Sequence, residues 1–360
     1  MYFPNLKLNN LNILITGGAG FIGSHLVKKI LENTNSQIFN IDKLGYSSDL
    51  SLIKSSTEAR SRHHHIKINL KDKKEVFLAV EKSRPNIVIH LAAESHVDRS
   101  IDNPSIFIES NILGTFNLLE ASKNYWDKLP EDKKSFFRFH HVSTDEVFGS
   151  LNMDGKFDEN SQYQPNSPYS ASKAASDHLV RSWFHTYGLP TLISNCSNNF
   201  GPHQFPEKFI PLIINKALKN KKIPIYGNGA NIRDWLYVED HIDAILEIIL
   251  NGIPGSTYCV GGSAERTNLQ VAKEVCRILD KKLATKRSLS NNIEFVKDRP
   301  GHDLRYSINS SFIKKEIGWK PKNSFEINLQ LTVDWYLNNQ KWCDNALNKS
   351  GYKGERLGKI

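Results

Sequence analysis

Short apolar runs alternate with segments of helical periodicity through the first half of the chain. Strands are predicted at NILITG (12–17), QIFNID (37–42), HIKINL (65–70), NIVIHLAA (86–93) and SFFRFHHVST (135–144). Helices are predicted between them at FIGSHLVKKILEN (21–33), KKEVFLAVEKS (73–83) and SIFIESNILGTFNLLEAS (105–122). Apolar residues in these helical segments recur every three or four positions. Strands separated by helices favour right-handed crossovers, so the pattern predicts an α/β fold with a doubly wound parallel sheet.

The pattern changes in the second half of the chain. A long helix is predicted from Tyr169 to Gly188, followed by a strand at 190–197. Two stretches rich in proline, glycine and aromatic residues, 202–211 and 223–241, are predicted to be long loops over a site. The helical VEDHIDAILEIIL and the strand-like STYCVGG are expected to rejoin the sheet, and the remainder forms a smaller, mainly helical lobe.

Composition narrows the class of protein without naming a function. The 360 residues are 39% hydrophobic, which suits a globular chain, and the net charge is 47 − 38 = +9. The surplus could attract nucleic acid, a membrane surface or a nucleotide diphosphate. No dense basic block occurs, so a solvated lysine-rich surface is favoured, with no nucleic-acid or membrane partner. The first twelve residues lack the apolar region of a signal peptide, and no run approaches the ~20 apolar residues of a membrane span.

Cysteine and histidine positions do not predict a metal site. The four cysteines lie far apart without paired ligand spacing, which favours a reducing, cytoplasmic location over disulfides or zinc. Three consecutive histidines, 63–65, stand at a strand edge, where neighbouring side chains cannot easily converge on one ion. No metal is therefore expected.

The segment TGGAGFIGSH joins the first predicted strand to the first predicted helix. Gly17, Gly20 and Gly23 would let the backbone turn tightly and approach a pyrophosphate at the helix N-terminus. Asp42 closes the second strand 19 residues after Gly23, where a carboxylate can accept hydrogen bonds from a ribose diol and repel a 2′-phosphate. The arrangement predicts a Rossmann-like domain that binds NAD rather than NADP.

A tyrosine and a lysine lie four residues apart at the start of the long helix. Tyr169 and Lys173 share one helix face, so the ammonium charge is expected to lower the pKa of the phenol and make it usable as a base. In this context the pair resembles the nucleotide-sugar branch of the extended short-chain dehydrogenases/reductases. That resemblance implies that Tyr169 deprotonates a sugar hydroxyl while the nicotinamide accepts hydride from the same carbon.

Two adjacent acids follow a predicted buried strand, in the stretch STDEVFG. The chain is expected to turn there, which would free Asp145 and Glu146 from pointing to opposite faces. Thr144-Asp145-Glu146 resembles the signature of the dTDP-glucose 4,6-dehydratases, within the NAD-dependent epimerase/dehydratase family. After oxidation at sugar carbon 4, one carboxylate could remove the proton on carbon 5 while a carboxylic acid protonates the departing hydroxyl on carbon 6.

The resemblance runs from about residue 12 to about residue 336 and includes HLAAESHVDRS, SNNFGPHQFPEKFIP, PIYGNGANIRDWLYVEDH and DRPGHDLRY. It implies a hydro-lyase that converts dTDP-glucose to dTDP-4-keto-6-deoxyglucose, with Asp145 as acid and Glu146 as carbon-5 base. Thr144 would bind the reacting hydroxyl, and Lys173 would assist Tyr169 and hold the nicotinamide ribose. NAD would be regenerated in each cycle, and the product would be a deoxysugar precursor of the dTDP-rhamnose kind.

The same resemblance implies two further sets of contacts. Cofactor contacts are expected at Gly17, Gly20, Phe21, Ile22, Gly23, Asp42, Lys43, Asn69, Leu70, Leu91, Ala92, Ala93, Ser95, Ser110, Tyr169, Lys173 and Asn199. Substrate contacts are expected at Ser95, Thr144, Asp145, Glu146, Asn198, Lys208, Phe209, Ile210, Pro211, Leu212, Ile213, Pro224, Ile225, Tyr226, Arg233, Asn268, Asp298, Arg299 and His302. Lys208, Arg233 and Arg299 supply cations suited to a diphosphate.

The chain departs from the family at a few positions. Phe148 and Phe200 stand where the family often has tyrosine, Asn69 stands where an aspartate is usual beside the adenine, and His203-Gln204 replaces a common Tyr-His pair. Three alternatives stay open: the same dehydration on UDP-glucose or another nucleotide sugar, epimerisation at carbon 4, and a non-catalytic protein that senses NAD or a nucleotide sugar.

Domain boundaries and assembly complete the expectations. Residues 1–195 are predicted to form the NAD-binding domain, rejoined by about 234–262, with a substrate lobe at 196–345 and a tail at 346–360. The helix at 169–187, with Ala171, Leu179 and Trp183, and the helix at 106–119 resemble the dimer interface of the family. A homodimer is therefore favoured over burial of these residues in the protein's own core.

Overall fold

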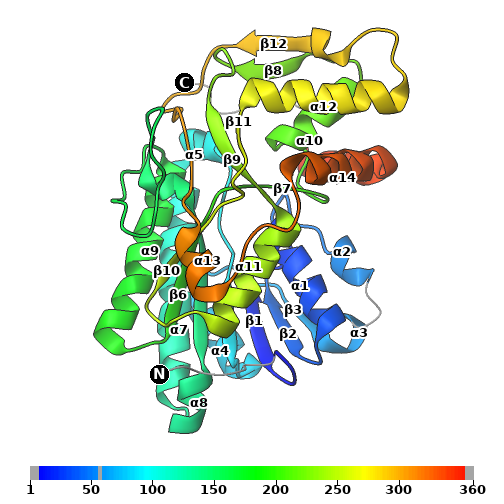
Figure 1. Ribbon diagram of the computed structural model, residues 1–360. Coiled ribbons are helices and arrows are strands. Elements are labelled where there is room, and N and C mark those ends of the chain that lie inside the picture. The colour runs from blue at the N-terminus through cyan, green and yellow to red at the C-terminus, as the bar shows by residue number, and fades with distance from the viewer. Residues whose placement is uncertain (1–7, 56–58, 353–360) are drawn as a thin grey trace.

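The computed structural model describes residues 8–55 and 59–352. Within that range, seven parallel strands form one sheet in the order β10-β6-β5-β4-β1-β2-β3 (Figure 1). They are β1 (Asn12–Thr16), β2 (Gln37–Ile41), β3 (His63–Ile66), β4 (Ile87–His90), β5 (Arg138–Thr144), β6 (Thr191–Cys196) and β10 (Thr257–Val260). The strand order reverses between β1 and β4, and ligands of such sheets bind beyond the carboxyl ends of the strands at that point.

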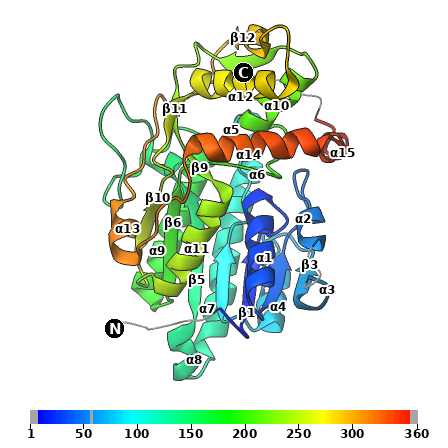
Figure 2. The same ribbon diagram turned by 45° about the vertical axis from the view of Figure 1, so that its right-hand side comes forward.

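Helices cover both faces of this sheet. On one face lie α1 (Phe21–Asn33) and α11 (Val238–Asn251), whose apolar residues pack with those of β1, β2 and β4 in one buried cluster (Figure 2). On the other face lie α4 (Lys73–Ser83), α7 (Gly114–Asp127) and α9 (Pro168–Tyr187), which share a second cluster with the opposite sides of the same strands. A parallel sheet buried on both faces explains why its strands are almost continuously apolar.

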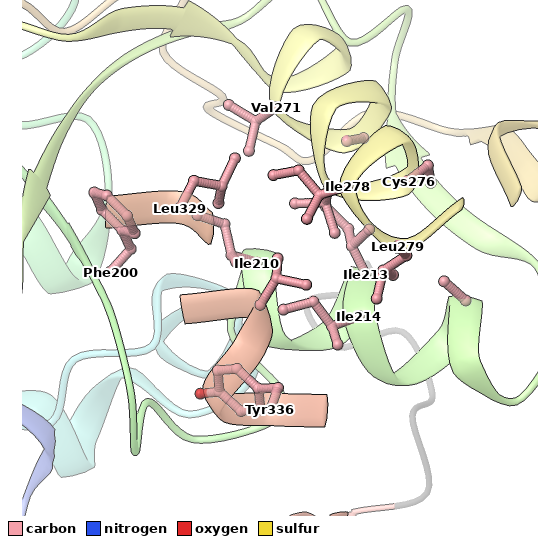
Figure 3. Close-up of a cluster of buried hydrophobic side chains, with 14 of the residues drawn as sticks. Phe200, Ile210, Ile213, Ile214, Val271, Cys276, Ile278, Leu279, Leu329 and Tyr336 are labelled. Atoms are coloured by element: carbon pink, nitrogen blue, oxygen red, sulfur yellow. The ribbon is translucent and has the colours of Figure 1, made fainter. Parts of the chain in front are cut away.

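A smaller lobe stands over the carboxyl ends of the strands (Figures 1 and 2). Its two small sheets have the orders β11-β9-β7 and β12-β8. Their strands are β7 (Asn198–Phe200), β8 (Ile223–Tyr226), β9 (Ile232–Tyr237), β11 (Glu265–Thr267) and β12 (Ile293–Val296). The helices α10 (Phe209–Leu218), α12 (Asn268–Leu283) and α14 (Phe325–Asn338) pack around one apolar cluster, shown in Figure 3.

Shorter elements connect these layers. They are α2 (Ser51–Lys54), α3 (Ala59–Arg62), α5 (Val97–Asp102), α6 (Pro104–Phe107), the π-helix η1 (Ile108–Leu113), α8 (Glu131–Phe136), the 3₁₀-helix η2 (Asp145–Phe148), the 3₁₀-helix η3 (Leu289–Asn292), α13 (Ser311–Ile317) and α15 (Gln340–Ser350). The helix α15 crosses residue 345, where the sequence placed the end of the substrate lobe.

The fold class is confirmed, and four local predictions differ from the structure. The stretch 223–241, expected to be loop, contains β8 and β9, because β9 pairs with β7 and β11, which are distant in sequence. The stretch 202–211 is loop only as far as Lys208, where α10 begins. The strand predicted at 65–70 lies instead at His63–Ile66, paired with β2. The helix predicted at 105–122 contains a π-helical segment, η1.

The predictions about metals and membranes concern features that can be compared with the structure over residues 8–55 and 59–352. There, no group of His, Cys, Asp or Glu is arranged to hold a metal ion, and the four cysteines are buried without a disulfide. In the same part of the chain, none of the helices combines the length and apolar character that a membrane span needs. Residues 1–7 and 353–360, which include most of the predicted N-terminal segment and tail, lie outside the described residues.

Candidate active site

The glycine turn at the end of β1 is packed too tightly for other residues. Gly17 has φ +75°, and a Cβ there would lie 2.7 Å from the Ala92 nitrogen in the loop after β4. A Cβ on Gly23, in the first turn of α1, would lie 2.2 Å from the Gly17 oxygen. The backbone at the N-terminus of α1 is therefore unscreened by side chains, which is what a pyrophosphate requires.

Asp42 anchors the neighbouring loop to this turn. It is 8% exposed, its Oδ2 accepts from the Ala19 N–H at 3.0 Å, and its Oδ1 accepts from the Leu44 N–H at 2.8 Å. Lys43 beside it pairs with Glu94 at 2.5 Å. A carboxylate held between the glycine turn and the end of β2 is placed to accept hydrogen bonds from a ribose diol. The donor set and the side-chain-free turn thus fit NAD.

Replacing Gly23 by alanine is expected to weaken NAD binding strongly. The added methyl group would overlap the Gly17 carbonyl, and overpacking of this kind costs about 1–3 kcal/mol. NAD affinity, measured by titration after the purified protein has been stripped of nucleotide, should fall about tenfold or more. Gly45→Ala is the control, because a Cβ there meets only the Lys43 side chain at 3.6 Å. Equal affinity of the two variants would contradict this role for Gly23.

The acid pair lies where β5 gives way to a turn of 3₁₀-helix, η2. Thr144 caps this helix, its Oγ1 accepting from the Glu146 N–H at 3.3 Å. The chain therefore turns at this point, as expected, and Asp145 and Glu146 are no longer placed on opposite faces of a strand. Because η2 follows the carboxyl end of a central strand, both acids lie at the ligand-binding edge of the sheet.

The environment separates the two carboxyl groups. Asp145 is 1% exposed and its Oδ2 has no hydrogen-bond partner among the described residues. Burial first, and then the charge of Glu146, raise the pKa of Asp145 well above its usual value. Glu146 is half-buried, and burial raises its pKa while the nearby Arg299 and Arg233 cations oppose the rise. Burial and the Glu146 charge thus favour the protonated form of Asp145, whereas the neighbouring cations favour the ionised form of Glu146.

The tyrosine and lysine stand at the beginning of α9. Ser167 and Ser170 form a capping box there, and Pro168 occupies the first helical turn, where its missing N–H is not needed. Lys173 is 4% exposed, and its Nζ donates to the Val142 carbonyl at 3.0 Å and contacts His141 Nε2 at 3.2 Å.

The expected lowering of the Tyr169 pKa is wrong for this structure. Burial, followed by the negative charge of Glu146, raises the pKa of Tyr169 well above its usual value. The Lys173 ammonium group instead contacts His141 and the Val142 carbonyl on β5. The four-residue spacing gave the shared helix face correctly, but it could not show where the flexible lysine side chain points.

Three cations act on the acid pair from the smaller lobe and the loops below it. Lys208, Arg233 and Arg299 each lower the pKa of Glu146, against the larger effect of burial. Lys208 Nζ donates to the Ser95 carbonyl at 2.9 Å, Arg233 lies over the Tyr306 ring at 4.2 Å, and Arg299 Nη1 pairs with an oxygen of Asp98 at 3.2 Å. The structure therefore brings the predicted diphosphate-binding cations to the predicted acids.

Other predicted positions differ in what their side chains can reach. Asn199 Oδ1 bonds to His241 at 2.8 Å, and His302 Nδ1 bonds to Asp298 at 2.6 Å. The side chains of Ile210, Ile213 and Ile225 are at most 1% exposed and lie in the core of the smaller lobe, where Figure 3 shows the first two. These three residues could reach a substrate only through their backbone.

The remaining predicted contact residues lie in or beside the following helices and strands. Phe21 and Ile22 begin α1, Leu91, Ala92 and Ala93 follow β4, Asn69 and Leu70 precede α4, and Ser110 lies in η1. Phe209, Pro211 and Leu212 belong to the first turn of α10, Pro224 and Tyr226 to β8, Asn198 to β7, and Asn268 opens α12.

Sequence reasoning missed a buried ionic cluster beside Lys208. The side chain of Glu207 is 1% exposed, accepts from Tyr46 OH at 2.5 Å and pairs with Arg99 at 2.8 Å. Arg99 also lies over the Tyr46 ring at 4.0 Å. The cluster joins the loop after β2 to the loop before α10. A charged residue between Pro206 and an active-site lysine was the one available signal.

A glycine turn for a dinucleotide and a Tyr-Lys helix, set in one parallel sheet, place the protein among the extended short-chain dehydrogenases/reductases. Comparison with known proteins agrees and narrows the class. The family described as GDP-mannose 4,6 dehydratase matches residues 14–332. The dTDP-glucose 4,6-dehydratase of Escherichia coli is 50% identical over 364 residues, covering 97% of this chain and 100% of that protein.

Solved structures give the same result. The dTDP-glucose 4,6-dehydratase from Bacillus anthracis in complex with NAD is 39% identical, with a TM-score of 0.81, covering 94% of this chain and 100% of that one. The enzyme of the same name from Streptomyces venezuelae, with NAD and TYD bound, is 37% identical, with a TM-score of 0.84, covering 93% and 99%. The chain belongs to the dTDP-glucose 4,6-dehydratase family.

Proposed function

We propose that the protein is a hydro-lyase that converts dTDP-glucose to dTDP-4-keto-6-deoxyglucose and water with NAD as cofactor. The observation that carries the proposal is the acid pair, in which burial favours the protonated form of Asp145 and nearby cations favour the ionised form of the adjacent Glu146. Relatives that are 50% identical carry the name dTDP-glucose 4,6-dehydratase, and solved members of the family contain NAD. A carbon-4 epimerase would have no use for this pair.

The residues of the chain divide the reaction among them. Thr144 donates to the carbon-4 hydroxyl of the sugar, and Tyr169, after releasing its own phenolic proton to solvent, accepts the proton of that hydroxyl. NAD, when bound, accepts the hydride from carbon 4 and later supplies it to carbon 6. Glu146 removes the carbon-5 proton, and Asp145 protonates the carbon-6 hydroxyl so that it leaves as water. Glu146 then returns its proton to carbon 5, and Asp145 regains from solvent the one proton that Tyr169 released, so each residue is back in its starting state.

The electrostatics suit this order of events. Asp145 must hold a proton until the hydroxyl leaves, and burial favours that protonated form by raising the pKa of Asp145. Glu146 must be an anion when carbon 5 becomes acidic, and the neighbouring cations favour that anion. Lys208, Arg233 and Arg299 would hold the diphosphate of the sugar nucleotide, and Arg forks suit phosphate oxygens. Lys173 would hold the nicotinamide ribose, and Asp42 the adenosine ribose.

A homodimer in the cytoplasm is part of the same proposal. Ile106, Ile108 and Leu113, in α6 and η1, are 41–49% exposed and form an apolar surface beside α9. Trp183, expected at the interface, is instead 7% exposed within the core of the chain, so η1 rather than Trp183 would carry the contact. A sedimenting species of 41 kDa at micromolar concentration would contradict the dimer. Buried, unpaired cysteines suit a reducing compartment.

The domain division also stays a proposal. Residues 1–195 with about 234–262 would bind NAD, and 196–345 would bind the nucleotide sugar. The return of β10 to the edge of the large sheet supports this division, since that strand lies within 234–262.

Direct turnover tests the function. The purified protein, given dTDP-glucose and NAD, is expected to form a 4-keto sugar that absorbs in alkali. Specificity constants for dTDP-glucose, UDP-glucose and GDP-mannose should favour dTDP-glucose. A clear preference for UDP-glucose would overturn the assignment of the base while retaining the reaction. Bound NAD without turnover of any of the three sugars would favour a sensing protein instead.

A further inference from the structure

A third polar side chain lies one helical turn beyond Lys173 on α9. Asp177 is 0% exposed, and its Oδ2 accepts hydrogen bonds from Ser143 Oγ at 2.9 Å, Tyr163 OH at 2.9 Å and Asn195 Nδ2 at 3.0 Å. These hydrogen bonds lower the cost of burying an ionised carboxylate, but they do not supply a positive charge. A buried anion of this kind needs a cationic partner.

His141 on β5 connects this carboxylate to the catalytic lysine. Its Nε2 lies 3.2 Å from Lys173 Nζ and 3.2 Å from Asp177 Oδ1. His141 is 0% exposed, and its Nδ1 has no hydrogen-bond partner among the described residues. A neutral imidazole has one N–H, so Nε2 either accepts from Lys173 or donates to Asp177. In either tautomer the ring fills the space between the two charges.

The charges of this cluster follow from burial. Burial, followed by the neighbouring Lys173 charge, lowers the pKa of His141 to about 4, so the ring is uncharged at neutral pH. Burial lowers the pKa of Lys173 to about 8, and the Asp177 carboxylate is the largest effect opposing that loss. Burial also tends to raise the pKa of Asp177, but the His141 contact and the Lys173 charge hold it below its usual value.

The other titratable groups around Lys173 carry no charge that could replace Asp177. Burial raises the pKa of the Cys196 thiol on β6 to about 12 and lowers the pKa of His90 on β4 well below its usual value. Tyr169, on α9 itself, is uncharged in its resting phenol form, which burial and the Glu146 charge favour by raising its pKa. Among these groups on β4, β5, β6 and α9, Asp177 is the anion.

We propose that Asp177 is a positioning residue that, across His141, holds Lys173 as an ammonium group against the Val142 carbonyl of β5. The same carboxylate also connects to the backbone of Thr144, because Asn195 Nδ2 donates to Asp177 and to the Thr144 carbonyl at 3.1 Å. Asp177 is 0% exposed and so acts through its neighbours rather than on a ligand. Its effect rests on the proposed function, in which the Lys173 ammonium holds the nicotinamide ribose.

Asp177→Asn removes the charge and keeps the size of the side chain. Without the carboxylate, the pKa of Lys173 should fall further below about 8, so the ammonium form is lost within the neutral range. The kcat for dehydration is expected to fall about tenfold for each unit by which that pKa drops below the assay pH. The alkaline limb of the pH profile of kcat should move to lower pH, with KM for dTDP-glucose unchanged.

Two matched variants separate charge from packing. Tyr163→Phe removes one hydrogen bond to Asp177 but keeps the carboxylate, so its alkaline limb should stay at the position of the unsubstituted enzyme. Asp177→Glu retains the charge, so the alkaline limb of its pH profile of kcat should lie close to that of the unsubstituted enzyme. A fall in kcat with an unchanged pH profile in Asp177→Asn, or an equal shift in Tyr163→Phe, would show a merely structural role and overturn the proposal.

A double variant covers the case in which Asp177→Asn does not fold. Lys173→Met with Asp177→Asn removes both charges and leaves neither unpaired. Because Asp177 acts through Lys173, adding Asp177→Asn to Lys173→Met should leave the single-turnover rate of NADH formation unchanged. A further fall of tenfold in the double variant would contradict the proposed route.

Thermal unfolding gives a readout that needs no substrate. The pKa of Lys173 is lower in the folded than in the unfolded chain, so the folded state loses this proton first and its stability rises with pH above the folded pKa. That rise should begin near pH 8 in the unsubstituted protein, at lower pH in Asp177→Asn, and be missing in the double variant. Identical profiles would overturn the inference, whereas failure of dTDP-glucose turnover alone would overturn only the proposed function.

Discussion

Glu146→Gln is expected to lower the formation of the 4-keto-6-deoxy sugar by about 10²–10⁴-fold while leaving carbon-4 oxidation intact. An amide cannot take the carbon-5 proton, so the reaction stops at the oxidised sugar. The substitution also removes the negative charge that raises the pKa values of Tyr169 and Asp145, so the first step is not impeded. Reduced cofactor should therefore accumulate and absorb near 340 nm in a single turnover.

Asp154→Asn is the matched control for this experiment. Asp154 is an exposed acid in the loop that follows η2, so its loss should change neither dehydration nor the absorbance of reduced cofactor. Dehydration by Glu146→Gln at the normal rate would show that another group removes the carbon-5 proton. Loss of both product and reduced cofactor would mean that Glu146 is needed already for oxidation.

Tyr169→Phe should abolish both signals together. Removing the phenolic oxygen takes away the group that accepts the carbon-4 hydroxyl proton, so oxidation should slow by about 10²–10⁴-fold. No reduced cofactor should accumulate, in contrast to Glu146→Gln. The fold should persist, because the Tyr169 ring packs edge-on against Phe107 with centroids 6.3 Å apart, and phenylalanine preserves that contact.

Tyr187→Phe, at the other end of α9, provides the comparison. Tyr187 is 46% exposed and distant in sequence from the acid pair, so its hydroxyl should be dispensable. Thermal unfolding of each variant would confirm that the helix is intact. Accumulation of reduced cofactor in Tyr169→Phe would show that a different base starts the reaction, and the roles of Thr144 and Tyr169 would need to be exchanged or reassigned.

Local signals in the sequence were sufficient for most of the nucleotide-binding half. The predicted helix 73–83 has the same bounds as α4, since Asp72 caps it and Arg84 ends it in a left-handed conformation. The glycine turn could be predicted equally well from the sequence, because its requirement for small residues is local. In both cases the forces that decide the structure act between residues close in sequence.

Features that depend on contacts between residues far apart in the sequence could not be predicted in this way. The strand β9 exists because β7 and β11 pair with it, and its Pro- and Gly-rich surroundings suggest a loop when viewed alone. The Glu207 cluster joins Tyr46 to a residue 161 positions away. The direction of the Lys173 ammonium group depends on a histidine of β5, 32 positions earlier. Spacing within one helix cannot report any of these contacts.

The position of β10 has a consequence for biosynthesis. Among the residues that the structure describes, β10 is the strand that pairs with the outer edge of β6, and the chain between these strands builds the first part of the smaller lobe. During translation the edge of β6 therefore stays unpaired until Thr257–Val260 has been synthesised. An exposed strand edge can pair with other chains. Synthesis that stalls within this interval should leave nascent chains that depend on chaperones and aggregate without them.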